Sequence, residues 1–257
     1  MPDQWEVLAL RYATLDAALL SVPHDADVHD RIGPMDYYIW VVRDGTRTIL
    51  VDTGFGEAAA RARGRTLLRH PVDALAAVGV AAEDVADVVV THLHYDHAGN
   101  LAAFPNARFH LQEREMAFAT GRYMLRRPIR RPFEVEDVVE AVRLVYREQV
   151  VFHDGDYILA PGVGVHLIGG HSMGLQVLTV EGRRRIVVAS DALHMAHLME
   201  TDDVFPVMFD YPATLDGYRR LRALAGADGI ILPGHDPSVR ALWPAVEGTG
   251  GDVVRVG

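Results

Sequence analysis

Cysteine is absent from this sequence of 257 residues. Its absence excludes disulfide bonds and thiolate metal sites, so any metal ion must be held by nitrogen and oxygen ligands. Positive charge is also scarce, because 35 acidic residues outnumber 25 basic ones and the formal net charge is −10. Binding to nucleic acid requires a basic surface that neutralises phosphates, so we expect no nucleic-acid partner.

Long apolar runs and a signal peptide are missing too. No apolar run approaches the roughly 20 residues of a membrane-spanning helix, and residues 1–5 lack the basic and apolar regions of a secretory signal. We therefore expect a soluble, cytoplasmic protein with no membrane partner. The apolar share of 49% and the charged share of 23% are typical of a globular chain that buries a substantial core.

Four potential metal ligands lie within six residues, directly after the apolar residues 85–90. The apolar run predicts a short buried strand, and the ligands follow its end, where sites on layered α/β folds tend to form. In an extended chain, residues two apart point the same way, so we expect His92, His94 and Asp96 to converge while His97 faces elsewhere. A solvated histidine-rich loop is the alternative, but this density of ligands favours a metal site.

Four shorter polar motifs follow apolar runs elsewhere in the chain. They are Val51-Asp52-Thr53-Gly54, Gly170-His171-Ser172-Met173-Gly174, Ser190-Asp191-Ala192 and Pro233-Gly234-His235-Asp236. Taken alone, each could serve a structural purpose, such as capping the next segment. Their presence together with the central motif favours a shared metal centre.

In this order, the five motifs resemble those of the metallo-β-lactamase superfamily, whose signature HxHxDH is matched by HLHYDH. The resemblance spans residues 40–236. It implies an α/β fold, an αββα sandwich in which two mixed β-sheets pack face to face, helices cover the outer faces and metals lie at one edge. No linker rich in Pro, Gly or Ser divides the chain, so we expect residues 1–257 to form one domain.

The resemblance also implies a set of ligands. It assigns His92, His94 and His171 to one metal ion, Asp96, His97 and His235 to a second, and Asp191 to a bridge between the two. Asp52 is expected to orient a ligand through hydrogen bonds without binding metal itself. Imidazole and carboxylate ligands suit two zinc ions, although iron, manganese or cobalt could bind the same set.

Hydrophobic patterns around the motifs predict alternating strands and helices. We expect strands at 6–20, 37–42, 47–51, 85–90, 108–111, 150–153, 157–159, 163–168, 175–180, 185–189 and 229–232, with a final edge strand within 250–257. We expect helices within 56–70, 71–78, 112–119, 135–147 and 213–225.

Residues 121–133 differ from their surroundings because five arginines stand among aromatic and aliphatic residues. This composition fits either a solvated connection or a lid, placed at about residues 114–134, whose arginines attract an anionic substrate. We expect the walls of a substrate pocket to include Met35, Phe118, Tyr123 and Phe209.

Within the superfamily, the segment Ser190-Asp191-Ala192-Leu193-His194 and the later Leu232-Pro233-Gly234-His235 look most like the N-acyl homoserine lactonases, a dinuclear, quorum-quenching branch. The absence of cysteine excludes the zinc β-lactamases that use a cysteine ligand. RNA-processing nucleases of this fold would need a basic path, which the net charge disfavours. Those lactonases have a tyrosine three residues after the bridging aspartate, whereas this chain has His194, so the choice of substrate stays open.

The resemblance implies a hydrolase that opens a lactone ring by attack of a metal-bridging hydroxide. His194 would help to hold the developing oxyanion, and Asp96 would pass a proton to the leaving alkoxide. One alternative is another small-molecule hydrolase on the same centre, acting on a thioester, aryl ester, β-lactam or phosphoester. A non-catalytic scaffold or a redox protein is a third possibility. The expected partner is a small-molecule lactone or ester, and the expected assembly is a monomer or homodimer.

Overall fold

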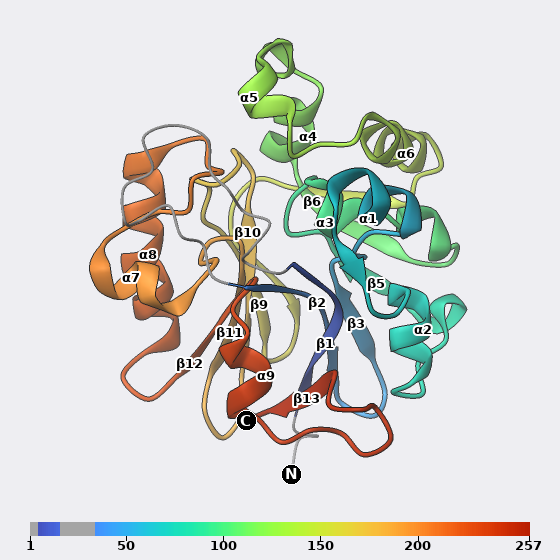
Figure 1. The fold of residues 1–257 in the computed structure, drawn as a ribbon, viewed down its shortest axis with the longest axis vertical. Helices are drawn as coiled ribbons and strands as arrows, with labels where there is room; N and C mark the ends of the chain where they lie inside the picture. Colours follow the sequence, from blue (N-terminus) through green and yellow to red (C-terminus); the bar gives the residue numbers. More distant parts are fainter. Residues whose placement is uncertain (1–4, 16–33) are drawn as a thin grey trace.

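Two mixed β-sheets pack face to face in the computed structural model, which describes residues 5–15 and 34–257 (Figure 1). The first sheet contains β1 (Glu6–Leu15), β2 (Met35–Arg43), β3 (Thr48–Val51), β4 (Thr66–Leu67), β5 (Asp87–Val89), β6 (Arg108–Gln112), β7 (Val150–His153) and β13 (Val253–Val256). The second contains β8 (Tyr157–Ala160), β9 (Val163–Leu167), β10 (Gln176–Val180), β11 (Ile186–Ser190) and β12 (Ile230–Pro233).

Both sheets combine antiparallel and parallel pairs. The first has the order β13-β1-β2-β3-β5-β6-β7, with β4 beside β1, and the second has the order β12-β11-β10-β9-β8. Strands β3, β5, β6 and β7 run parallel, as do β11 and β12, whereas the other neighbours are antiparallel. The predicted sandwich of two mixed sheets is confirmed.

Helices cover the outer faces and one end of the sandwich (Figure 1). They are α1 (Glu57–Arg63), α2 (Pro71–Ala76), α3 (Tyr95–Ala98), α4 (Glu113–Ala119), α5 (Arg127–Arg130), α6 (Val135–Tyr146), α7 (Ala196–Thr201), α8 (Tyr211–Ala225) and α9 (Ser238–Leu242). The part of the chain that the structure describes also contains the short 3₁₀ helices η3 (Ala82–Asp84), η4 (Leu101–Ala103) and η5 (Arg122–Leu125). None of the helices in the described ranges has the length and apolar character of a membrane span.

Alternation along the strands divides the core into two clusters. In β1, Val7 and Ala9 face the second sheet, whereas Leu8 and Leu10 face the helices on the outside. In the opposing sheet, β10 directs Leu178 inward in the same way. Side chains two apart point to the same face of a strand, so each strand contributes to both layers. Burial of each such aliphatic side chain stabilises the fold by about 1.5–3 kcal/mol.

Most of the predicted elements are confirmed, and the differences concern short elements and boundaries. Strand β1 ends at Leu15, and residues 16–20 of the predicted first strand lie outside the described residues. The expected final strand is β13, at the edge of the first sheet. The sequence patterns did not indicate β4, α7 or α9, which have two, six and five residues.

The carboxyl ends of parallel strands bring the polar motifs to one edge of the sandwich. Asp52 follows β3, the central histidine motif follows β5, Asp191 follows β11 and Gly234-His235 follows β12. Because β3 is parallel to β5 and β11 is parallel to β12, each sheet delivers two motifs in the same direction. Ligand sites on α/β sheets form at such strand ends.

Candidate metal centre

The first group of potential ligands consists of His92, His94, His171 and Asp191, whose ligand atoms all lie within 4.8 Å of one another. His94 Nδ1 is 2.9 Å from His171 Nε2. Asp191 Oδ2 is 3.2 Å from His171 Nε2 and 3.9 Å from His92 Nε2. All four side chains are buried.

A second group consists of Asp96, His97 and His235, which are likewise buried and within 4.8 Å of one another. Asp96 Oδ2 is 3.7 Å from His97 Nε2 and 3.6 Å from His235 Nε2. Two imidazole nitrogens and one carboxylate oxygen thus point at a common space.

Asp191 joins the two groups. Its Oδ2 faces the first group, whereas its Oδ1 is 3.3 Å from His97 Nε2 and 3.1 Å from His235 Nε2. The neighbouring Gly234 permits this position, because a Cβ added to it would lie 2.6 Å from Asp191 Oδ1. A carboxylate with one oxygen toward each group is arranged to bridge two cations.

Hydrogen bonds set the protonation of the ligand rings. His171 Nδ1 is 2.7 Å from the carbonyl oxygen of Val207, and His235 Nδ1 is 3.0 Å from that of Asp36. A carbonyl only accepts, so Nδ1 carries a proton in both rings and Nε2 is the nitrogen that faces the cluster. A ring held in this way presents Nε2 to a metal ion once that nitrogen is deprotonated.

The cluster contains polar atoms that the described residues do not satisfy. His92 Nε2, His97 Nε2 and Asp191 Oδ1 are buried and have no hydrogen-bond partner in that part of the chain. Such atoms are costly to bury. Divalent cations coordinated by the two groups would satisfy all three, and a set of five imidazoles and two carboxylates suits zinc or another first-row cation.

Electrostatics separates the two groups. Burial and repulsion between the imidazoles lower the pKa of His92 and His94. In His171, burial outweighs the attraction of Asp191 and lowers the pKa to about 3. Burial also acts to lower the pKa of His97 and His235, but Asp191 and Asp96 outweigh it and raise both pKa values. The imidazoles of the first group are therefore neutral, whereas metal binding at the second group would displace protons.

Asp52 lies behind the cluster and holds His97. Its Oδ2 is 2.7 Å from His97 Nδ1, and its two oxygens accept hydrogen bonds from the backbone N–H and the hydroxyl of Thr91 at 2.7 and 2.8 Å. Burial raises the pKa of Asp52, although His97 and Thr91 act to lower it. The carboxylate therefore faces the far nitrogen of His97 rather than the space between the ligands.

His194 lies beside the proposed bridge. Its Nε2 is 2.9 Å from Asp191 Oδ2, and its ring stacks on that of Phe205 with a centroid distance of 3.9 Å and an interplanar angle of 6°. Asp191, His194 and His235 form a further group of possible ligands. An N–H of His194 that is donated to Asp191 must be released before it can be donated to a substrate.

A cavity of about 920 Å³ opens over both groups, and Asp96, Asp191, His94, His171, His194 and His235 lie on its surface. Three residues expected in the substrate pocket, Met35, Phe118 and Phe209, line it. Tyr123 instead packs behind two of them, with its ring centroid 5.9 Å from that of Phe118 and 5.1 Å from that of Phe209. The segment expected to form a lid contributes Phe118, Pro128, Ile129, Arg131, Pro132 and Glu134.

Comparison with known proteins identifies the family. A family model described as the metallo-beta-lactamase superfamily matches residues 32–235, which is most of the chain. The chain belongs to the metallo-β-lactamase superfamily. The family that the motifs predicted is confirmed, and with it the class of metal-dependent hydrolases.

Relatives within the superfamily include enzymes that act on lactones. An N-acyl homoserine lactonase from Bacillus cereus is 28% identical over 220 residues, which cover 79% of this chain and 81% of that protein. A solved quorum-quenching N-acyl homoserine lactone lactonase has a TM-score of 0.74 at 23% identity and covers 93% of this chain and 94% of its own. AidC, a dizinc quorum-quenching lactonase in complex with a product, has a TM-score of 0.72 at 20% identity and covers 100% of this chain and 95% of its own.

The metallo-β-lactamase signature departs from the extended geometry that its spacing suggested. Helix α3 begins at Tyr95, so the chain is helical at Asp96. Asp96 therefore joins His97 in the second group instead of following His92 and His94. The expectation drawn from alternation alone is wrong at Asp96, and the ligand set implied by the superfamily resemblance stays a prediction.

Glu115 supports the centre and was not singled out by the sequence. Its buried carboxylate accepts hydrogen bonds from Leu93 N at 2.9 Å, Ser172 Oγ at 2.8 Å and Gly174 N at 2.9 Å. It thereby ties the loop of the central motif to the loop that carries His171. A glutamate in the first turn of a short helix resembles any solvated helix-start acid, so only the tertiary contact distinguishes it.

Proposed function

We propose that this chain is a lactonase that holds two divalent metal ions in the seven-residue cluster. The observation that supports this most strongly is Asp191, whose two oxygens face two separate groups of imidazole ligands. The similarity to N-acyl homoserine lactonases favours a lactone over the other substrates of the superfamily.

The residues of this chain supply the surroundings for ester cleavage. When bound, a pair of divalent cations lowers the pKa of a shared water and polarises a carbonyl group. His194 stands where its Nε2–H, once released from Asp191, can donate to an oxyanion. Asp96, at the surface of the cavity, is placed to carry a proton to the departing alkoxide. Opening a lactone leaves the alcohol and the carboxylate in one molecule.

The cavity is consistent with a small substrate. A volume of about 920 Å³ falls within the range of roughly 300–1,000 Å³ typical of small-molecule sites. Phe118, Phe205 and Phe209 give one part of its wall an apolar character suited to a ring or a short hydrocarbon.

A panel of substrates tests the reaction. Zinc-loaded enzyme is assayed with an N-acyl homoserine lactone, an aromatic lactone, nitrocefin, lactoylglutathione, an aryl ester and a phosphotriester. We expect the highest kcat/KM with a lactone, and complete loss of turnover after treatment with a chelator. A higher kcat/KM with the thioester, the β-lactam, the aryl ester or the phosphotriester would refute the assignment as a lactonase.

Replacing the proposed bridge tests the metal centre. Asp191→Asn keeps the size of the side chain but removes the charge that two cations would share. We expect bound metal to fall from two ions per chain to one or fewer, and kcat/KM to fall by about 10³-fold or more, because the cations supply several kcal/mol to the transition state. His197→Gln, on the exposed side of α7, is the control. Full turnover by a metal-depleted Asp191→Asn protein would exclude the dinuclear mechanism.

A further inference from the structure

One wall of the cavity is basic, and the proposed reaction does not use it. Arg65, just before β4, lines the cavity and is half-buried. Its Nε donates to the hydroxyl of Tyr95 at 3.1 Å, and its Nη1 donates to the carbonyl of Arg63 at 2.6 Å. A guanidinium has five N–H groups, so three remain for a ligand. Arg65 forms no ion pair with a carboxylate of the described residues.

The neighbouring Arg63 shows the contrast. It pairs with Glu134 at 2.7 Å and donates to the carbonyls of Arg131 and Phe133 at 3.0 and 3.3 Å. Its charge is therefore paired with a carboxylate, and its Nε and Nη2 donors are occupied. Residues 114–134 cover the cavity and are here called the covering segment; its carboxylate that lines the cavity, Glu134, is already paired with Arg63. The charge of Arg65 is left for a molecule that enters from solvent.

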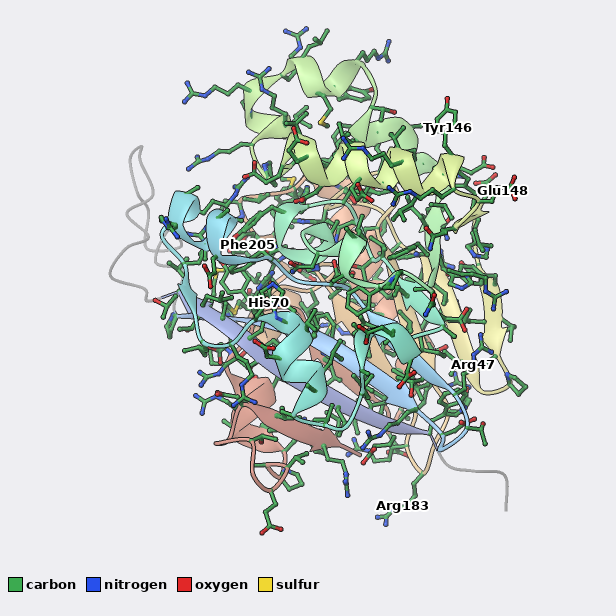
Figure 2. All side chains as sticks on the ribbon, turned by 90° about the vertical axis from the view of Figure 1, so that its right-hand side faces the viewer. Arg47, His70, Tyr146, Glu148, Arg183 and Phe205 are labelled. Carbon is green, nitrogen blue, oxygen red and sulfur yellow. The ribbon has the colours of Figure 1, made fainter. Side chains whose placement is uncertain are left out.

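The covering segment adds further positive charge at the mouth of the cavity. Five of its arginines, at positions 122, 126, 127, 130 and 131, are exposed and have no carboxylate partner within the described ranges, whereas Arg114 pairs with Asp154 at 3.4 Å. Figure 2 shows nitrogen-tipped side chains projecting around α5 at the top of the molecule. In a chain with a net charge of −10, such a local concentration raises the encounter rate of anions with this end. Arg131 is one of the exposed arginines and also part of the basic wall, because it lines the cavity.

We infer that the substrate is a lactone that carries a carboxylate, and that Arg65 binds this carboxylate, assisted by Arg131 at the mouth. The inference rests on the proposed lactonase function and defines the class of its substrate. Guanidinium and carboxylate form paired, charge-assisted hydrogen bonds, which are about twice as strong as neutral ones. Asp96 and Asp191 are the other acids that the described residues place on the cavity surface, and in the loaded enzyme they would hold the cations and not pair with Arg65.

The position of Tyr37 limits the length of this substrate. Its ring centroid is 4.9 Å from that of His235, in the second ligand group, and 6.0 Å from Cζ of Arg65. One aromatic ring thus separates the guanidinium from the metal centre. A carboxylate bound to Arg65 lies only a few bonds from the ester that is cleaved, which favours a compact lactone acid over a long chain charged at its far end.

Two lactones that differ only in charge test the inference. Zinc-loaded enzyme is assayed with γ-butyrolactone bearing a ring carboxylate (paraconic acid) and with the corresponding carboxamide. We expect kcat/KM for the carboxylate to exceed that for the carboxamide by about 10- to 100-fold, the effect of one charge-assisted hydrogen-bond pair. Added salt should lower kcat/KM for the carboxylate and not for the carboxamide, because screening acts on charge.

Matched variants assign the effect to a residue. In Arg65→Met the ratio of the two kcat/KM values should fall to near one, whereas Arg126→Gln, which removes a charge from the covering segment but does not line the cavity, should keep it within about twofold of the wild-type ratio. Metal content and circular dichroism verify that each variant is loaded and folded. If Arg65→Met does not fold, the salt dependence of the wild-type enzyme decides.

The outcomes separate the two proposals. Equal kcat/KM for the two lactones in the wild-type enzyme, or an unchanged ratio in Arg65→Met, overturns the carboxylate site and leaves the lactonase standing. Failure to cleave these lactones, the neutral N-acyl homoserine lactone and the aromatic lactone overturns the lactonase, and the carboxylate site with it.

Discussion

Asp52 follows β3 in the first sheet, and Ser190 ends β11 in the second. Both residues have left-handed backbone angles, with φ of +62° and +46°. Such angles are unfavourable for residues with a side chain, at a cost of about 1–3 kcal/mol each. Their side chains meet beneath the cluster, where Ser190 Oγ is 3.1 Å from Thr91 Oγ1 and 3.4 Å from Asp52 Oδ2. The strained positions thus lie where each sheet turns toward the proposed ligands.

Asp52→Asn tests whether this carboxylate tunes a metal ligand. Asparagine tolerates a left-handed backbone and keeps an oxygen for Thr91, but it removes the negative charge beside His97. We expect the affinity of the second metal to fall by about 10- to 100-fold while the fold is retained. Competition with a chelator measures the affinity, and Asp216→Asn on the exposed side of α8 is the control. Unchanged affinity would limit Asp52 to holding the backbone at Thr91.

Residues with a motif could be placed from the sequence, and those defined only by tertiary contact could not. His92, His94 and His97 lie close together in the chain, so their density is visible at once. Glu115 contacts Ser172 across 57 positions, and nothing in its local sequence indicates that contact. Arg65 likewise follows a short helix among other arginines, and it becomes notable only because it lines the cavity and pairs with no acid of the described residues.

At the scale of elements, α4 is a fixed point for the covering segment. Glu115 in its first turn accepts three hydrogen bonds from the two loops that carry proposed ligands. Helix and loop approach closely at Gly174, where an added Cβ would lie 2.3 Å from the backbone nitrogen of Glu115. These hydrogen bonds therefore attach the start of the segment to the loops of the metal centre.

Glu115→Gln tests the strength of this lock. The amide keeps one acceptor oxygen but turns donors toward the Gly174 N–H or Leu93 N–H, leaving at least one buried donor unsatisfied. We expect the free energy of unfolding to fall by about 2–3 kcal/mol, measured by urea titration. Glu113→Gln, exposed in the same first turn, should change it by less than about 1 kcal/mol. Equal effects of the two substitutions would contradict the proposed anchor.

Element prediction succeeded where burial imposes a pattern. Strands β1, β2 and β10 alternate between two cores or are buried on both faces, and such runs are visible as apolar sequence. Helices α7 and α9 are too short to show a full amphipathic repeat, and β4 consists of two residues paired to β1. Residues 121–133 contain a 3₁₀ helix and one turn of α-helix, and their mixture of arginine and apolar residues has no clear period.

For the whole molecule, a polar cluster joins the sheets at the edge where β7 leads into β8. Buried Asp87 accepts hydrogen bonds from Arg47 at 2.7 Å and Arg108 at 3.0 Å and contacts His110 Nε2 at 3.0 Å. His110 Nδ1 is 3.1 Å from His153 Nε2 in β7, and the His153 ring stacks on Tyr157 of β8 at 3.4 Å. The packing of the two sheet edges could not be predicted from local sequence. These contacts, here called the seam, show how the edges meet.

His153 makes this seam sensitive to acid. Burial, and then the nearby His110, lower the pKa of His153 to about 4, below the value of about 6.5 for an unfolded chain. The unfolded state binds the proton more tightly, so stability is full above pH 6.5 and declines as the pH falls toward 4. Because the ring is partly exposed, we expect its share of the loss to be about 1–2 kcal/mol.

Comparison of variants isolates this share from loss of metal at low pH. Urea unfolding at pH 7 and pH 4 should show a smaller acid-induced loss in His153→Gln than in the wild-type protein. His197→Gln, which changes an exposed histidine, should behave as the wild type does. The same decline in all three proteins would assign the acid sensitivity to other groups.

The hydrogen bonds of Arg63 and Glu115 have a consequence for traffic through the cavity. They attach both ends of the covering segment: its last residues bind α1, and its first residues bind the loops of the metal centre. A segment that is held at both ends is less free to swing away from the cavity than one that is held at a single end. Access to the cavity then depends on the width and the charge of its opening, so substrates are selected by size and charge before they reach the metal centre.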